Sequence, residues 1–174
     1  MLSYNFKYYW LQPVLMAVPS RRFRLWVLKH LYHVTIGRGT IVCRKVQFRS
    51  GHHIRIGENC VVNSNTLLDG RGGIIRIGNH VDIAQDCLIW TMEHDLHTHE
   101  AKGGDVWIGD YCWIGCRVMI KPGVQIGESS VCAAYAVVTK DVEPNSVYGG
   151  IPARKMGERN RTKDYILSFQ SKYR

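Results

Sequence analysis

Three histidines lie within six residues of one another in the segment Thr91-Met-Glu-His-Asp-Leu-His-Thr-His-Glu100. Three roles are compatible with this cluster. His94, His97 and His99 could bind a metal ion through their ring nitrogens. One correctly placed imidazole could instead act as a general base near neutral pH. The segment could also be a solvated polar loop, and the residue types alone leave these roles open.

A six-residue repeat surrounds this segment and predicts the scaffold that carries it. From Ile108 to Val138, an aliphatic residue or cysteine opens each block of six and Gly or Ala usually follows. Eleven blocks follow this frame, opening at Ile36, Val42, Ile56, Val62, Ile77, Ile83, Ile108, Ile114, Ile120, Ile126 and Cys132. A period of six is typical of a left-handed parallel β-helix, whose triangular coils hold about eighteen residues each. We therefore predict an all-β solenoid of this class, with N-terminal and C-terminal helical additions.

The fifth place of every block is Thr, Val, Cys, Ser or Ala. These residues are Thr40, Val46, Cys60, Thr66, Val81, Cys87, Cys112, Val118, Val124, Ser130 and Ala136. We expect the opening side chain to fill the narrow prism inside the coils and the fifth residue to pack beside it. Gly in the second place is expected to allow unusual backbone angles at a tight corner.

Residues 1–35 lie outside the repeat and form a basic, aromatic segment with five Lys or Arg and no acid. Ser20 is a candidate N-cap for a helix in this segment. The apolar face of that helix would carry Phe23, Trp26, Val27 and Leu31. The helix can cap the first coil, contact an anionic membrane surface peripherally, or do both.

The β-helix is expected over residues 36–157, with two interruptions. The first is the turn-like insertion Asp69-Gly-Arg-Gly-Gly73, and the second is the polar loop 91–105. Long loops on a regular scaffold tend to carry function. Residues 158–174 are expected to form a C-terminal helix that begins near Thr162. Its inward face would carry Tyr165, Ile166, Phe169 and Tyr173.

The net charge of +9 fits an anionic membrane or a phosphorylated ligand. Nucleic acid is not expected, because no nucleic-acid motif accompanies the charge. No apolar run approaches the ~20 residues that span a bilayer, and no clear signal peptide is present, so a cytoplasmic location is the default expectation. The six cysteines show no paired metal-binding spacing, and four of them occupy interior places of the repeat.

Two segments resemble a known family. Gly104 to Gly127 and Val137 to Arg154 are similar to the signature of the hexapeptide-repeat acyltransferases. The resemblance covers about residues 36–157 and is nearest to the maltose/galactoside acetyltransferases and the polysaccharide O-acetyltransferases. It implies a homotrimer that moves acetyl from acetyl-CoA to a sugar hydroxyl, without a metal, at sites between subunits.

The resemblance assigns roles near the histidine cluster. His94 matches the catalytic histidine of the family and would take the proton from the acceptor hydroxyl. Asn63 matches an acceptor-binding asparagine, Asp69 lies near an acidic acceptor-binding residue, and Trp113 matches a tryptophan beside the acceptor and thioester. No cysteine has an obvious nucleophile setting, which favours direct transfer in a ternary complex.

The resemblance also assigns a coenzyme A groove. Its residues would be Cys116, Ala134, Thr139, Lys140 and Arg154, with the two cations meeting the phosphates. Tyr135 stands where glycine is usual and would narrow one end of the groove.

The expected function is O-acetylation of a sugar, in cell-surface polysaccharide synthesis, on a small-molecule or lipid-linked acceptor. An amino-sugar N-acetyltransferase remains an alternative, since the same base could serve an amine. A non-catalytic or metal-binding trimeric β-helix is the competitor from another class.

Overall fold

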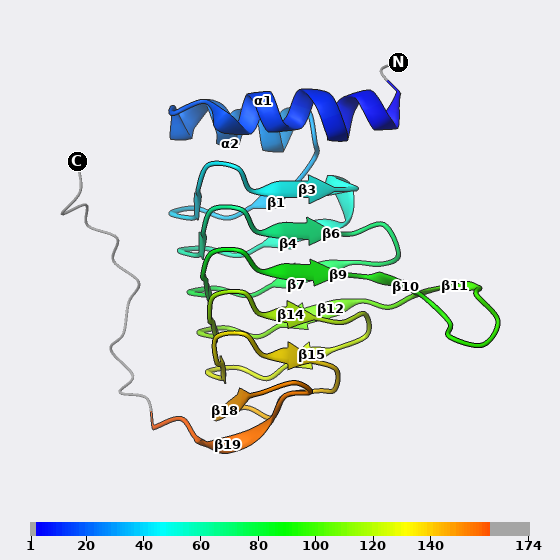
Figure 1. Cartoon of the computed structure of the whole chain (residues 1–174). Coiled ribbons are helices and arrows are strands. Elements are labelled where there is room, and N and C mark those ends of the chain that lie inside the picture. The colour runs from blue at the N-terminus through cyan, green and yellow to red at the C-terminus, as the bar shows by residue number, and fades with distance from the viewer. Residues whose placement is uncertain (1–2, 161–174) are drawn as a thin grey trace.

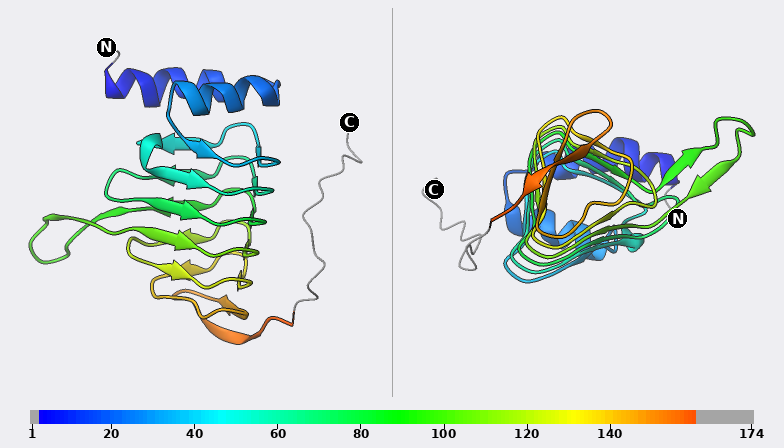
Figure 2. Two further views of the ribbon diagram at one scale, coloured as in Figure 1. Left: turned by 180° about the vertical axis from the view of Figure 1, so that it is seen from behind. Right: turned by 90° about the horizontal axis from the view of Figure 1, so that it is seen from below.

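The computed structural model describes residues 3–160, and the chain between the N-terminal helices and its end winds into a parallel β-solenoid (Figure 1). Three stacks of short parallel strands form the three faces of a triangular prism, which is visible end-on in Figure 2. This architecture is the left-handed β-helix that the repeat predicts.

Each face takes one strand from each coil. Face 1 contains β1 (Thr35–Ile36), β4 (Ile54–Ile56), β7 (Ile75–Ile77), β12 (Val106–Ile108) and β15 (Gln125–Ile126). Face 2 contains β2 (Ile41–Val42), β5 (Val61–Val62), β8 (Asp82–Ile83), β13 (Trp113–Ile114), β16 (Val131–Cys132), β18 (Ser146–Gly149) and β19 (Arg154–Glu158). Face 3 contains β3 (Gln47–Arg49), β6 (Leu67–Asp69), β9 (Leu88–Trp90), β14 (Met119–Ile120) and β17 (Val137–Val138).

The register of face 1 gives the length of each coil. Ile108 lies beside Ile126, eighteen residues further on. The earlier coils are longer, because Ile36 pairs with Ile56 and Ile56 with Ile77. The extra residues lie at the corner between faces 3 and 1, where a short 3₁₀ turn, η2 (Gly51–His53), and the insertion 69–73 occur. The longest coil joins Ile77 to Ile108 and contains the histidine-rich loop.

The interior of the prism confirms the predicted packing. All eleven block-opening residues and all eleven fifth-place residues are buried. The buried thiols of this interior also bond to backbone: Sγ of Cys87 and of Cys112 donate to the carbonyl oxygens of Gly115 and Gly127, both at 3.1 Å. The small fifth residue therefore packs beside the opening side chain and reaches the next coil.

The reason expected for glycine in the second place is wrong. Left-handed backbone occurs instead in the fourth place of every block, at Gly39, Lys45, Asn59, Asn65, His80, Asp86, Tyr111, Arg117, Gly123, Ser129 and Tyr135. Second-place glycines are needed for close approach between coils. A Cβ on Gly37 would lie 2.5 Å from the backbone of Gly57, and one on Gly115 would lie 2.6 Å from the amide nitrogen of Ala134.

Helices cover the N-terminal end of the solenoid. A π-helical segment, η1 (Phe6–Leu11), runs into α1 (Gln12–Ala17), and α2 (Arg21–His30) follows. Figure 1 shows α1 and α2 lying across the first coil. The side chain of Ser20 accepts a hydrogen bond from the Phe23 amide, which confirms the predicted N-cap.

The helices close the open edge of the first coil with side chains. The amide of Gln12 accepts from the Phe48 N–H at 2.8 Å and donates to the Phe48 carbonyl at 2.9 Å. The guanidinium of Arg24 donates to the Val42 carbonyl at 3.1 Å. An uncovered strand edge would offer these groups to another chain. The N-terminal segment therefore caps the solenoid.

The inward face of α2 differs from the predicted one. Arg24, Val27 and Leu28 are its buried residues, whereas Phe23 and Trp26 are exposed. Arg24 faces inward because three backbone carbonyls receive its guanidinium. Apolar spacing alone could not reveal that pairing.

At the other end, β18 and β19 form an antiparallel pair that completes face 2. Glu158 is the last residue of β19. The C-terminal helix that is predicted to begin near Thr162 lies outside the described residues. Among residues 3–160, no helix has the length and apolar character needed to cross a bilayer.

Candidate active site

The histidine-rich loop is a β-hairpin that leaves the solenoid at the corner between faces 3 and 1. Its strands are β10 (Met92–His94) and β11 (Ala101–Gly103), and His94 pairs with Ala101 at their outer end. Figures 1 and 2 show the hairpin projecting far beyond the coils. The imidazole of His94 is exposed.

The two acidic neighbours of His94 are both engaged. The carboxylate of Glu93 forms an ion pair with Lys121 of the next coil at 2.8 Å. Asp95 accepts hydrogen bonds from the backbone N–H groups of His97 and Thr98. These contacts fix the residues on either side of His94.

Asp95 also forms an ion pair with Lys102 across the hairpin. The Lys102 ammonium and the N–H groups of His97 and Thr98 lower the pKa of the Asp95 carboxyl to about 2. Asp95 is therefore ionised at neutral pH and holds the turn in place, rather than orienting the imidazole beside it.

The first insertion supports the base of the hairpin. The buried hydroxyl of Thr91 donates to the Asp69 carbonyl at 2.9 Å and accepts from the Gly72 N–H at 3.0 Å. A Cβ on Gly72 would lie 2.4 Å from the Thr91 carbonyl oxygen. The two interruptions of the repeat are thus one structural unit, and glycine is required where they touch.

Asp69 is buried at this corner, and its carboxylate is occupied. Arg71 forms a bidentate pair with it, through Nε at 2.9 Å and Nη2 at 2.7 Å, and Arg49 approaches at 3.3 Å. These contacts make Asp69 an anchor for two arginines. Direct bonding of an acceptor by Asp69 stays a prediction.

Asn63 lies where face 2 meets the corner with face 3. It is half-buried, and its side-chain amide donates to the Ile83 carbonyl at 3.0 Å and towards Asp82 Oδ1 at 3.4 Å. Its backbone is not left-handed, since Asn65 and not Asn63 has positive φ. The side-chain amide of Asn63 therefore lies next to the carboxylate of Asp82.

Asp82 is a candidate that no sequence motif singles out. It lies on β8 in register with Trp113 on β13, and Trp113 is 50% exposed. Burial raises the pKa of the Asp82 carboxyl. A carboxylate, an amide and an exposed indole on one face are suited to hydroxyl groups on a ring, because the first two bond hydroxyls and the third stacks on C–H groups.

A single chain does not bring His94 to Asn63, Asp82 and Trp113. The hairpin leaves the corner between faces 3 and 1, whereas the other three residues lie on face 2 and its corner with face 3.

The five predicted coenzyme A residues all lie in the last coils. Cys116 and Ala134 occupy the corner between faces 2 and 3 in successive coils. Thr139 and Lys140 come directly after β17. Arg154 begins β19, just after the Ala153 N–H bonds to the Val137 carbonyl. Lys140 and Arg154 are exposed, and the Arg154 guanidinium donates a hydrogen bond to the Ala153 carbonyl at 2.9 Å.

Tyr135 occupies a left-handed place beside Ala134, with φ of 64°. Its hydroxyl accepts a hydrogen bond from Arg117 Nη1 at 2.7 Å, and the guanidinium lies 5.4 Å from its ring. Arg117 in turn approaches Asp86 at 3.7 Å. The side chain that replaces the usual glycine is therefore held against its neighbour in the preceding coil.

Three cysteines lie inside the prism, where burial keeps their thiols protonated. Burial raises the pKa values of Cys87 and Cys112 to about 11 and that of Cys132 to about 12, so these thiols are protonated at neutral pH. Within residues 3–160, no three His, Cys, Asp or Glu side chains converge in the way a metal ion would need.

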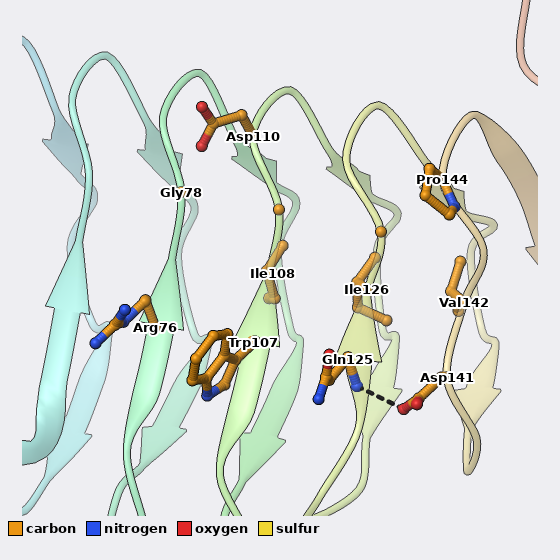
Figure 3. A pocket seen from close by; sticks show the side chains of 12 residues that line it. Arg76, Gly78, Trp107, Ile108, Asp110, Gln125, Ile126, Asp141, Val142 and Pro144 are labelled. Carbon is orange, nitrogen blue, oxygen red and sulfur yellow. Dashed lines mark hydrogen bonds between the residues drawn. The ribbon is translucent and has the colours of Figure 1, made fainter.

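A shallow hollow of about 440 Å³ lies on face 1 (Figure 3). The Arg76 guanidinium stacks on Trp107 at 4.8 Å, and Asp141 accepts from the Gln125 N–H at 2.8 Å. None of the predicted site residues line it. This hollow is separate from the sites assigned above.

Comparison with known proteins agrees with this fold. Residues 105–140 match the family model "Bacterial transferase hexapeptide (six repeats)". The galactoside O-acetyltransferase of Escherichia coli strain K12 is 37% identical over 148 residues, which cover 81% of this chain and 71% of that protein.

Solved structures give the same picture. A maltose O-acetyltransferase from Clostridium difficile 630 superposes with a TM-score of 0.79 and 30% identity, covering 87% of this chain and 84% of that chain. A hexapeptide-repeat acetyltransferase from Vibrio cholerae, solved with acetyl coenzyme A, also gives 0.79, with 31% identity over 87% of this chain and 85% of that one. The chain belongs to the hexapeptide-repeat acetyltransferases, the family that includes the galactoside and maltose O-acetyltransferases.

Proposed function

We propose that this protein transfers the acetyl group of acetyl-CoA to a hydroxyl of a sugar, with His94 as general base. The observation that carries the proposal is the state of His94. It stands exposed at the outer end of β10, while Glu93 and Asp95 on either side are bonded to Lys121 and Lys102. A base must be accessible and held in place, and this arrangement supports both requirements.

A homotrimer would complete the site. The outward residues of face 3 include Leu67, Leu88, Met119 and Val137, and those of face 2 include Ile41, Val131 and Val147. Face 1 instead presents Arg55, Arg76, Trp107 and Gln125. A closed three-membered ring uses two different surfaces of each subunit, and faces 2 and 3 are the apolar pair.

Packing face 2 on the neighbour's face 3 would bring the acceptor-binding residues of one subunit close to His94 of the other. The hairpin follows directly from β9 on face 3, so its His94 would extend towards the neighbour's face 2. Asn63, Asp82 and Trp113 lie there. Each site would then take its base from one subunit and its acceptor-binding residues from the next.

The chemistry is direct acyl transfer. The His94 imidazole takes the proton of the acceptor hydroxyl as the oxygen attacks the thioester carbonyl, the C–S bond breaks, and coenzyme A leaves as the thiol after protonation. Asn63 and Asp82 would accept or donate bonds to other hydroxyls of the sugar, with Trp113 beside its ring. The raised pKa values of Cys87, Cys112 and Cys132 argue against these three buried thiols as the nucleophile of an acyl-enzyme.

Coenzyme A would lie along the last coils. Small side chains at Cys116 and Ala134 leave room for its extended arm, and Thr139 offers a hydroxyl. Lys140 and Arg154 would meet its phosphates, because both cations are exposed and charge-assisted bonds to phosphate are strong.

We infer that the acceptor is a lipid-linked sugar intermediate of cell-surface polysaccharide synthesis, modified in the cytoplasm. The basic, aromatic N-terminal segment supports this choice over a free sugar.

The direct test is acetyl-CoA turnover by the purified protein. The release of coenzyme A should be followed with free sugars, nucleotide sugars and sugar–polyprenyl phosphates as acceptors. The proposal predicts transfer to at least one of them, an O-acetyl product that mild alkali removes, and a trimer by light scattering. An active enzyme whose product is alkali-stable would be an N-acetyltransferase. A monomer at micromolar concentration would overturn the intersubunit site.

A further inference from the structure

The capping helices have an apolar face that points away from the coils. In η1 and α1, the residues turned towards the coils are Tyr8, Gln12 and Met16. Residues two places earlier lie on the opposite side of a helix, since two residues turn the chain by about 200°. Those residues are Phe6, Trp10 and Val14, and all three are exposed, with Trp10 at 73%.

The second helix continues this surface. Arg24, Val27 and Leu28 face the first coil, which leaves Arg22, Trp26 and Lys29 on the outward side. Trp26 is 58% exposed and packs between Phe23 and His30, with ring centroids 6.4 Å and 5.4 Å away. Each helix therefore presents a tryptophan to the outside, and the second places cations beside it.

The positive charge of this surface of the capping helices indicates an anionic partner. Residues 1–35 contain five Lys or Arg and no Asp or Glu, and only Arg24 among the five is buried. Exposed indoles beside cations are the pattern of segments that lie in the interface of an anionic bilayer, where the rings sit at headgroup level and the cations meet lipid phosphates.

We propose that the outward face of the cap, formed by Phe6, Trp10, Val14, Arg22, Trp26 and Lys29, docks the protein on an anionic phospholipid membrane. This inference deepens the proposed function, because it names the surface on which a lipid-linked acceptor would be met. The docking itself needs no catalysis. The helices that close the solenoid edge through Gln12 and Arg24 thus have a second use on their other side.

The order of the coils supports this orientation. Asn63 lies in the second coil, close to the cap, whereas Lys140 and Arg154 follow the last coils at the far end. Successive strands are about 4.8 Å apart, so the acceptor-binding residues lie roughly 10–20 Å below the capping helices. A docked cap would hold the acceptor end near the membrane and the coenzyme end in solution.

A trimer would strengthen docking. In a ring whose three-fold axis runs along the solenoids, all three caps face the same side. Linked weak contacts raise the overall affinity well above that of one contact.

The test is co-sedimentation of the full-length protein with vesicles, independently of its activity. Vesicles of equal parts phosphatidylcholine and phosphatidylglycerol should bind the protein, pure phosphatidylcholine should bind it weakly, and added salt should release it. Tryptophan emission should shift to shorter wavelength on binding. The double variant Trp10→Ser/Trp26→Ser should bind about tenfold more weakly or worse, since both rings leave water on docking.

Matched controls separate docking from unspecific effects. Trp107→Ser removes an exposed indole from face 1, and Arg55→Gln/Arg76→Gln removes two exposed cations there. These variants should bind vesicles like the wild type, whereas Arg22→Gln/Lys29→Gln should lose binding. Equal melting temperatures would show that the variants fold. Absence of vesicle binding by the wild type, equal binding by the Trp10/Trp26 variant, or end-to-end pairing of trimers through the cap would overturn the proposal.

Discussion

The side chain of Gln12 bonds to the backbone of Phe48 in the way that a neighbouring strand would. Its side-chain amide forms both backbone hydrogen bonds of this residue, one as acceptor and one as donor, from a helix that shares no sheet with it. Both groups are buried. A β-solenoid must end somewhere, and here one glutamine satisfies the edge that the first coil leaves open.

Replacing this amide should weaken the protein measurably. Gln12→Leu keeps the volume but leaves the N–H and C=O of Phe48 without partners, which should cost about 2–4 kcal/mol of unfolding free energy. Urea unfolding measures the change. Gln47→Leu, an exposed change on the same strand, should alter stability by less than about 0.5 kcal/mol. Equal effects of the two variants would mean that the Gln12 contacts are not important.

His94→Ala should abolish most of the catalysis. Loss of a general base typically lowers kcat by about 10²–10⁴-fold, with the affinity for acetyl-CoA and the trimer intact. His97→Ala and His99→Ala are matched controls in the same hairpin and should lose much less. A dead His97→Ala enzyme beside an active His94→Ala enzyme would place the base elsewhere in the loop.

Removing both cations that are proposed to bind the phosphates should weaken coenzyme binding. Lys140→Ala/Arg154→Ala is expected to cost about 2–4 kcal/mol in acetyl-CoA affinity by calorimetry, and more at low salt than at high salt. Lys155→Ala is the control, because Lys155 already forms ion pairs with Glu143 and Glu158 at 2.7 Å and 2.6 Å. Unchanged affinity in the double variant would move the coenzyme groove to another surface.

Asp82 should affect the acceptor and not the coenzyme. Asp82→Leu is expected to raise the KM for the acceptor about tenfold or more and to leave the KM for acetyl-CoA unchanged, because a carboxylate bond to a hydroxyl is lost. Asp82→Asn should retain part of the affinity. Asp86→Asn, whose carboxylate already bonds to Asn65 at 3.0 Å, is the control. Equal KM values for Asp82→Leu and wild type would remove Asp82 from the site.

The buried thiols predict loss of stability in alkali. Burial raises the pKa values of Cys112 and Cys132 from an ordinary 9.0 to about 11 and about 12. Their contribution to the free energy of unfolding is full below about pH 9. It is lost as pH rises towards these values, by up to about 1.4 kcal/mol per pH unit for each thiol. Urea midpoints should therefore fall less steeply between pH 8 and pH 10.5 in Cys112→Ala/Cys132→Ala than in the wild type. Parallel slopes would contradict this account.

The coils could be predicted because their period is independent of tertiary detail. Every block opens with a residue that must fill the same prism, so Ile108 and Cys132 report the same constraint twenty-four residues apart. The reason for glycine could not be found in this way. Left-handed backbone occurs at Arg117 and Tyr135, residue types that do not signal it, while Gly115 is needed for contact with another coil.

The cap and part of the site could not be predicted, because they depend on contacts between residues far apart in the sequence. Helix α1, which has Pro13 in its first turn, continues a π-helical segment, and no capping or periodic pattern in the sequence predicted it. Arg24 faces inward because carbonyls of another element receive it. Asp82 belongs to no motif, and its interest comes from its place between Asn63 and Trp113. His94, by contrast, could be proposed from the resemblance, and its assignment awaits the variants above.

The repeat fixes two separate quantities, the face on which a residue lies and its height along the solenoid. Removing six residues from the regular coils between Asn63 and Ala134 would rotate everything that follows onto the next face, so that Ala134 would no longer lie on the same corner as Asn63. Removing eighteen would preserve every face and shorten the solenoid by one strand spacing, about 4.8 Å. In the proposed site, the number of coils between Asn63 and Arg154 would set the distance that the coenzyme A arm must span from its phosphates to the acceptor. Whole-coil insertions or deletions would change that distance stepwise.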